Sequence, residues 1–176
     1  VTLVKIPLAG GAPVSVVPVD TLITAAKFLV TSDGSRAVLF ANYGGQRRFV
    51  TVSLATGAIT PLGSAMPSGM IVDYQLSAND TFLLYRTDTG ASQQFSLYSQ
   101  PLAGGSPSRI GPALGTNESV SVHALSPNGQ WVLFVTDAGH DGTFDVYSAP
   151  VAGGSHTLLG SSIQSPYAGL TADDLP

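Results

Sequence analysis

Two short signals recur along the chain at nearly constant spacing. The first is a turn signal, which reads VTSDG at Val30–Gly34, LSAND at Leu76–Asp80, LSPNG at Leu125–Gly129 and LTADD at Leu170–Asp174, in steps of 46, 49 and 45 residues. The second reads LAGG at Leu8–Gly11, LATG at Leu54–Gly57, LAGG at Leu102–Gly105 and VAGG at Val151–Gly154, in steps of 46, 48 and 49 residues. Two signals with one period indicate a repeated structural unit, and its length fits a four-stranded propeller blade.

Each repeat is interpreted as four strands joined by short turns. In the third repeat the expected strands are Ser119–Leu125, Gln130–Asp137, Phe144–Val151 and Ser155–Gly160. Between the first two, Pro127 presets its own φ and Asn128-Gly129 supplies the positive φ of a tight hairpin. The chain then holds complete units at 23–69, 70–118 and 119–164, with partial units at 1–22 and 165–176.

The second strand of each repeat is continuously apolar. The runs are Ala37–Phe40, Phe82–Tyr85 and Trp131–Val135. A strand with one wet face should alternate, whereas sheets stacked face to face cover both faces of their inner strands. The runs therefore favour an all-β fold of propeller-type, four-stranded antiparallel blades. A β-sandwich or another sheet stack is the alternative.

The composition agrees with many short strands and narrows the possible functions. Only 10% of residues are charged, while the chain has 20 glycines and 12 prolines, a mixture that disfavours helices and supplies turns. A net charge of −4 with seven basic residues argues against a nucleic-acid partner. No cysteine is present, which excludes disulfides and thiolate chemistry. No apolar run reaches the about eighteen residues of a membrane span.

The segment LSPNGQWVLFVTDAGHDGTFDVYSAPVAGG, Leu125–Gly154, resembles the TolB-like propeller repeat of bacterial proteins. That repeat combines a Ser-Pro-Asp-Gly turn, an apolar strand, an Asp-rich hairpin tip and a strand that ends in a Gly-Gly turn. The likeness covers three units and is strongest in the third. The first unit lacks the proline of the turn, and in the second the whole turn reads SAND. The resemblance implies a propeller fold. Relatives serve as periplasmic binding scaffolds, as regulatory propellers of serine peptidases and as large surface proteins of unknown role.

Both ends of the chain carry part of a repeat. The first 22 residues correspond to the last two strands of a blade, and residues 165–176 correspond to a first strand. We therefore expect the chain to be a segment of a larger propeller, or to have its open ends completed by another copy. Head-to-tail completion is a heterologous contact, which gives rings or open filaments.

One hairpin tip carries candidate metal ligands. TDAGHDGTFD places Asp137, Asp141 and Asp145 four residues apart, and carboxylates on a turning loop can bind Ca²⁺. The spacing does not match an EF-hand, and hairpin tips favour Asp and Gly in any case. The metal interpretation is therefore weak, and no cofactor is expected.

Histidines and tyrosines give no definite site. His123, His140 and His156 lack the spacing of a helical metal site, so strand packing or surface exposure is the expected role. Tyr43 at a hairpin tip and Tyr167 near the last strand are candidates for a binding face, whereas core packing is expected for Tyr74. No G-x-S-x-G nucleophile motif occurs. No catalytic residue is predicted.

Two sequons, Asn79-Asp80-Thr81 and Asn117-Glu118-Ser119, lie in predicted loops and make Asn79 and Asn117 candidate glycosylation sites.

These features predict a non-enzymatic propeller scaffold of a bacterial extracytoplasmic or surface protein. Its loops would bind a protein or a glycan. One alternative is a structural subunit that assembles with further copies of itself into a fibre or ring. Another is the regulatory propeller of a serine peptidase.

Overall fold

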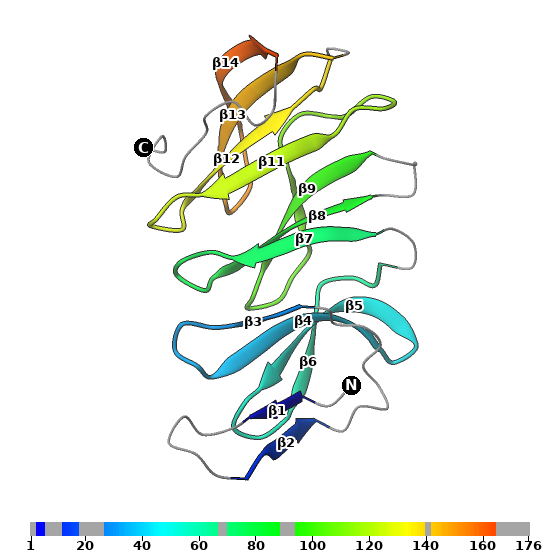
Figure 1. Cartoon of the computed structure of the whole chain (residues 1–176), viewed down its shortest axis with the longest axis vertical. Coiled ribbons are helices and arrows are strands. Elements are labelled where there is room, and N and C mark those ends of the chain that lie inside the picture. The colour runs from blue at the N-terminus through cyan, green and yellow to red at the C-terminus, as the bar shows by residue number, and fades with distance from the viewer. Residues whose placement is uncertain are drawn as a thin grey trace. The chain divides into compact units, whose positions relative to one another are not determined.

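The computed structural model describes residues 3–5, 12–17, 27–66, 70–88, 94–139 and 142–164 (Figure 1). Every regular element within these ranges is a β-strand. No helix in this part of the chain is long and apolar enough to cross a bilayer. The chain divides into two compact units, residues 1–67 and 68–176.

The first unit contains two antiparallel sheets. A short sheet pairs β1 (Leu3–Lys5) with β2 (Val14–Val17). A four-stranded sheet has its strands in sequence order: β3 (Phe28–Val30), β4 (Arg36–Tyr43), β5 (Gln46–Ser53) and β6 (Ile59–Leu62). Each strand pairs with the next one along the chain, as in a propeller blade.

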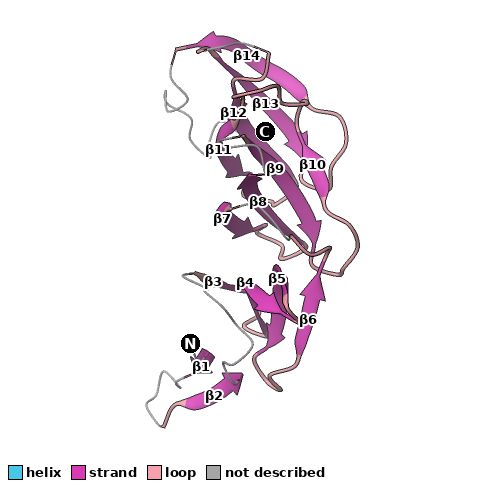
Figure 2. Cartoon of the chain, turned by 90° about the vertical axis from the view of Figure 1, so that its right-hand side faces the viewer, coloured by secondary structure: helices cyan, strands magenta, loops and turns pink. Residues whose placement is uncertain are grey.

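The second unit contains two four-stranded antiparallel sheets (Figure 2). The strands of the first are β7 (Ile71–Leu76), β8 (Phe82–Asp88), β9 (Phe95–Pro101) and β10 (Ser108–Ile110). The strands of the other are β11 (Val120–Leu125), β12 (Trp131–Thr136), β13 (Phe144–Pro150) and β14 (Thr157–Ile163). The predicted all-β fold of four-stranded antiparallel blades is confirmed.

Two of the expected strands differ from the prediction or lie outside the described residues. β14 runs three residues beyond the expected Gly160, because its irregular pairing with β13 continues until Ile163 lies opposite Phe144. The expected final strand, in residues 165–176, lies outside the described residues. The limits of the repeat units themselves stay a prediction.

The second strand of each four-stranded sheet is buried on both faces. In β12, the side chains of Val132, Leu133, Phe134 and Val135 are at most 2% exposed. Leu83 and Leu84 of β8 and Ala37 and Val38 of β4 are fully buried in the same way. This two-sided burial is the reason that these strands are continuously apolar, as the sequence predicted.

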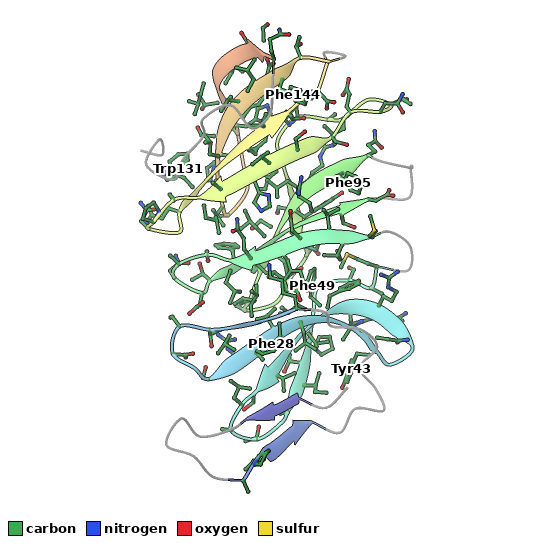
Figure 3. All side chains as sticks on the ribbon, viewed as in Figure 1. Phe28, Tyr43, Phe49, Phe95, Trp131 and Phe144 are labelled. Carbon is green, nitrogen blue, oxygen red and sulfur yellow. The ribbon has the colours of Figure 1, made fainter. Side chains whose placement is uncertain are left out.

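The four-stranded sheet of the first unit has an apolar core on each face of β4 and β5. One face carries a cluster of small and branched side chains: Ala37, Leu39, Ala41, Val50 and Val52. On the other face, Phe40 and Phe49 are cross-strand partners, and their ring centroids lie 5.1 Å apart. Phe49 is labelled in Figure 3. Because the two faces alternate along each strand, the pairing register fixes which side chains share a face.

One apolar core joins the two sheets of the second unit. Leu84, Leu97 and Ile110 from β8, β9 and β10 pack against residues of the other sheet: Val120, Val132, Phe134, Ala149 and Val151. Burying a side chain of this size stabilises a fold by about 1.5–3 kcal/mol. Contact across eight such residues makes the two sheets one cooperative packing unit.

The turn between the first two strands of each four-stranded sheet is built the same way three times. Ser126 Oγ donates to Asn128 Oδ1 (2.7 Å) and accepts from the Trp131 amide (2.9 Å). Asn128 Oδ1 also accepts from the Gln130 amide at 3.0 Å. Equivalent bonds form in the other two sheets, with Thr31 and Asp33 in one and Ser77 and Asn79 in the other. The recurring signal therefore encodes a side-chain network as well as a turn.

The positive φ expected of the Asn128-Gly129 pair is supplied by Gly129. Of Asn128 and Gly129, only Gly129 has a positive φ, 68°. Its amide donates to the Ser126 carbonyl at 2.9 Å, which closes a four-residue turn. Asn128 serves instead through its side-chain oxygen, so one left-handed residue is enough. Gly34 (φ 66°) and Asp80 (φ 52°) occupy the equivalent place.

Candidate functional site

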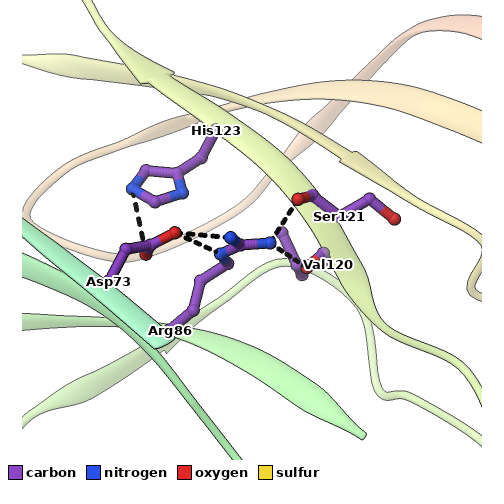
Figure 4. A network of polar contacts seen from close by, with 5 residues as sticks. All are labelled: Asp73, Arg86, Val120, Ser121 and His123. Carbon is purple, nitrogen blue, oxygen red and sulfur yellow. Dashed lines mark hydrogen bonds and ion pairs between the residues drawn. The ribbon is translucent and has the colours of Figure 1, made fainter. Parts of the chain in front are cut away.

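The most developed polar cluster of the described residues lies between the two sheets of the second unit (Figure 4). Arg86 on β8 lies directly opposite Asp73 on the neighbouring strand β7. Asp73 Oδ2 accepts hydrogen bonds from Arg86 Nε (2.9 Å) and Nη2. The pair is charge-assisted and bidentate on the guanidinium side, which is the strong form of such a contact.

Arg86 also contacts the other sheet, at a β-bulge. Val120 lies opposite Thr136 and Val122 lies opposite Val135, so Ser121 is an extra residue in β11. A bulge leaves ladder groups unpaired. Arg86 Nη1 donates to the carbonyl oxygens of Val120 (2.9 Å) and Ser121. One side chain thus hydrogen-bonds to two consecutive carbonyls at the bulge.

His123 completes the cluster from β11. Its imidazole is 6% exposed, and its Nε2 lies 4.0 Å from Asp73 Oδ1, a buried oxygen without a hydrogen bond. This separation is longer than a hydrogen bond. It becomes an ion pair only when the imidazole is protonated. The arrangement is an electrostatic clamp between two sheets, centred on Arg86.

Sequence reasoning missed this cluster. Asp73, Arg86 and His123 are far apart along the chain and match no motif. The only available signal was the presence of Asp73 and Arg86 within two largely apolar strands, IVDYQL and FLLYRTD. The contacts of Arg86 with β11 depend on a register shift that the residue pattern does not encode.

The predicted Ca²⁺ ligands have other partners where they are described. Asp137 Oδ1 accepts from the Ser119 amide (2.6 Å). Asp145 Oδ1 accepts from the Ser162 amide (3.1 Å). Asp141 lies outside the described residues, among which no group of three potential metal ligands occurs. Asp137 thus holds the backbone just before β11 and Asp145 holds the backbone of β14, and the calcium site stays a prediction.

The two sequon asparagines differ in their surroundings. Both are exposed. Asn79 Oδ1 accepts from Ser77 Oγ (2.7 Å) and Thr81 Oγ1 (2.7 Å), so its amide is held in the turn network. Asn117 has a left-handed φ of 65° in the connection that leads to β11. Glycosylation of either residue stays a prediction.

The remaining candidates are mostly packing residues. Tyr74 is 6% exposed and belongs to the core, as expected. His156 contacts Tyr147 edge-on, with ring centroids 5.3 Å apart. Tyr43 ends β4 at a hairpin tip and packs against the apolar cluster of that sheet. His140 and Tyr167 lie outside the described residues.

Comparison with known proteins identifies the fold. The chain is similar to TolB from Acinetobacter baumannii, with 16% identity over 91% of this chain and 38% of TolB and a TM-score of 0.56. An oligogalacturonate lyase in complex with manganese matches 91% of this chain and 48% of its own, with 15% identity and a TM-score of 0.67. Tricorn protease matches 85% of this chain and 14% of its own, with 11% identity and a TM-score of 0.63.

These similarities establish a TolB-like β-propeller fold. No protein-family model and no curated protein sequence matches the chain. The chain spans 38% of the Acinetobacter TolB and 56% of a TolB-like protein from Agrobacterium tumefaciens. Two of the similar proteins are by name enzymes, a lyase and a protease. At this level of identity the likeness concerns the fold, and function follows from the site.

Proposed function

We propose that this chain is a non-catalytic propeller scaffold of a bacterial extracytoplasmic protein, and that its hairpin tips bind a protein or a glycan. The observation that carries the proposal is the difference between the two ends of the sheets. One end bears the same turn in all three four-stranded sheets, with Ser or Thr followed two residues later by Asp or Asn. A turn with the same structure in all three sheets is expected to stabilise the fold and not to select a ligand.

The opposite ends of the sheets differ from one another. β4 and β5 are joined by Gly44-Gly45 alone, whereas six residues connect β8 to β9 and seven connect β12 to β13. Loops that vary on a constant framework are where binding proteins place their specificity. The proposed binding surface therefore comprises these hairpin tips.

The framework of the second unit is suited to hold such tips in place. The shared apolar core and the Arg86 clamp fix one sheet against the other. At the tip end, Glu118 accepts hydrogen bonds from the amides of Gly115 and Gly139, which ties the connection between the sheets to the β12–β13 hairpin. Rigid loops bind with less loss of conformational entropy.

The test is a binding screen with the purified chain. We expect glycan arrays or pull-downs from bacterial envelope fractions to give at least one saturable partner. Substitutions at the tips should weaken that binding, while substitutions in the repeated turns should leave it unchanged at a temperature where the protein is folded. The absence of any partner above background in both screens contradicts the proposal.

The similarity to part of tricorn protease favours a second candidate, the regulatory propeller of a peptidase. In that case the complete reading frame encodes a hydrolase domain with its own nucleophile motif. A reading frame without such a domain contradicts this candidate and leaves the scaffold proposal intact.

A further inference from the structure

The hairpin between β4 and β5 is short and conformationally defined. Gly44 and Gly45 have φ values of 62° and 75°, and they separate Tyr43 from its cross-strand partner Gln46. Two left-handed residues in a two-residue loop match a type I′ turn, whose twist suits the strands that it joins. Side chains beside this turn therefore have fixed positions.

Two arginines lie beside the turn, on opposite faces of the hairpin. Arg47 is exposed, and its guanidinium carbon lies 5.2 Å from the centroid of the Phe40 ring. Stacking on an aromatic face leaves the N–H groups at the guanidinium edge free for a ligand. Arg48 donates from Nη2 to Gln46 Oε1, and its Nε is buried without a hydrogen bond in the described part of the chain.

No carboxylate of the described residues pairs with these arginines. Asp73 pairs with Arg86 instead. Asp33 is the one acidic residue between positions 27 and 66, and it lies in the turn at the other end of the sheet, bonded to Thr31 and Ser35. The hairpin is therefore a positive tip in a chain whose net charge is −4.

Each arginine has an amide side chain beside it. Asn42 lies directly across the hairpin from Arg47, and Gln46 contacts Arg48. A guanidinium alone is sufficient for a protein carboxylate. Amides add both donors and acceptors, which suit the hydroxyl groups next to the carboxylate of a sugar acid.

We propose that the β4–β5 hairpin binds an acidic glycan, with Arg47 and Arg48 contacting sugar carboxylates and Asn42 and Gln46 contacting neighbouring hydroxyls. The inference rests on the proposed function, because it names the ligand class of one hairpin tip. Binding is electrostatic at an exposed surface, so added salt weakens it.

The test is calorimetric titration of the chain with three probes: an alginate hexamer, the neutral maltohexaose and a hexaglutamate peptide. We expect alginate to bind, maltohexaose not to bind, and hexaglutamate to bind at least about tenfold more weakly. Arg47→Gln and Arg48→Gln should each weaken alginate binding by about tenfold, the loss expected for a charge-assisted contact.

Matched variants keep the result interpretable. Arg109→Gln removes one exposed arginine from β10 in the second unit, and it should change alginate affinity by less than about twofold. Arg48→Lys keeps the charge without the planar fork and should give an intermediate affinity. Thermal unfolding of every variant establishes that a lost affinity is not a lost fold.

Four outcomes overturn the inference. Alginate binding that survives the double substitution Arg47→Gln/Arg48→Gln places the ligand elsewhere. Equal binding of hexaglutamate identifies an acidic peptide as the ligand class. If the parent chain does not bind alginate, and the double variant still binds a partner found in the binding screen, the hairpin site is rejected and the scaffold proposal stands. If no partner of any kind is found, both proposals are rejected.

Discussion

Arg86 on β8 donates a hydrogen bond to the backbone carbonyl of Ser121, the extra residue of the bulge in β11. Replacing the arginine leaves that carbonyl and the Asp73 carboxylate without their partner. We expect Arg86→Met to lower the free energy of unfolding by about 2–3 kcal/mol, measured by urea denaturation. Arg109→Ala, at an exposed position of β10, should change it by less than about 0.5 kcal/mol.

Two companion variants locate the effect. Ser121→Ala should be nearly neutral, because the contact uses the backbone carbonyl and not the side chain. Asp73→Ala combined with Arg86→Met should cost less than the sum of the two single changes, since the residues share hydrogen bonds. Strict additivity contradicts the clamp.

Gly111 approaches the ring of Phe134 in the core between the two sheets. Its φ is 92°, and a Cβ built on it lies 2.7 Å from Phe134 Cε2. Gly111→Ala should therefore combine backbone strain with overpacking and cost about 2–4 kcal/mol in denaturant unfolding. Gly104→Ala is the matched control, because its φ is 101° and no atom lies within 4 Å of the added Cβ.

The control separates the two causes. Gly104→Ala should show the backbone part alone, about 1–2 kcal/mol. Adding Phe134→Leu to the Gly111→Ala variant should relieve the steric clash. Phe134→Leu should therefore lower the free energy of unfolding less in the Gly111→Ala variant than in the parent protein. Equal costs for the two glycines indicate that the ring moves away freely.

The blades were predictable from sequence because their signals recur. The strands around Val132–Val135 and Leu83–Tyr85 are buried on both faces, and this leaves a continuous apolar run that periodicity can recognise. Proline is tolerated at the end of β9 and β13 because the strand pairing stops there, so a missing backbone N–H costs little. These are properties of one strand and its nearest turn.

The clamp was not predictable, because it depends on pairing between sheets. A bulge at Ser121 redirects two carbonyls, and nothing in VSVHAL marks which residue is extra. The turn at Ser126 shows the same limit on a smaller scale. Asn128-Gly129 indicated the turn and its positive φ correctly, whereas the side-chain hydrogen bonds of Asn128 were not predicted.

The repeated turn supports a prediction about its hydroxyl. Ser126 is 1% exposed, and its Oγ accepts from the Trp131 amide while it donates to Asn128. Ser126→Ala leaves the partly buried Trp131 amide without this acceptor and should cost about 1–2 kcal/mol in thermal or urea unfolding. Asn128→Asp should be tolerated within about 0.5 kcal/mol, because Asp33 holds the equivalent position in the first unit. A large loss from Asn128→Asp contradicts the equivalence of the turns.

Asp33 should give the first unit a distinct acid sensitivity. Hydrogen bonds from Thr31 and from the amide and hydroxyl of Ser35 lower the pKa of Asp33 from 3.8 to about 2. The folded state therefore favours the ionised carboxylate, and its contribution is present above the unfolded pKa and lost as the pH falls through about 2. Asp33→Asn should keep the turn, as Asn79 and Asn128 do, and flatten this part of the stability profile. Urea unfolding between pH 7 and the acid limit measures the difference; identical profiles contradict the assignment.

Tyr85 should make the protein sensitive to alkali. Its ring is 3% exposed and stacks on Tyr98 at a centroid distance of 5.6 Å. Burial, followed by the nearby Tyr98, raises the pKa of the Tyr85 phenol above its usual 10.0. The unfolded state ionises near pH 10 while the folded state stays neutral, so stability is complete below that pH and falls as the pH rises above it. Tyr85→Phe should remove part of this decline and part of the late phenolate absorbance. A parent and variant that lose stability equally between about pH 9 and 11 contradict the prediction.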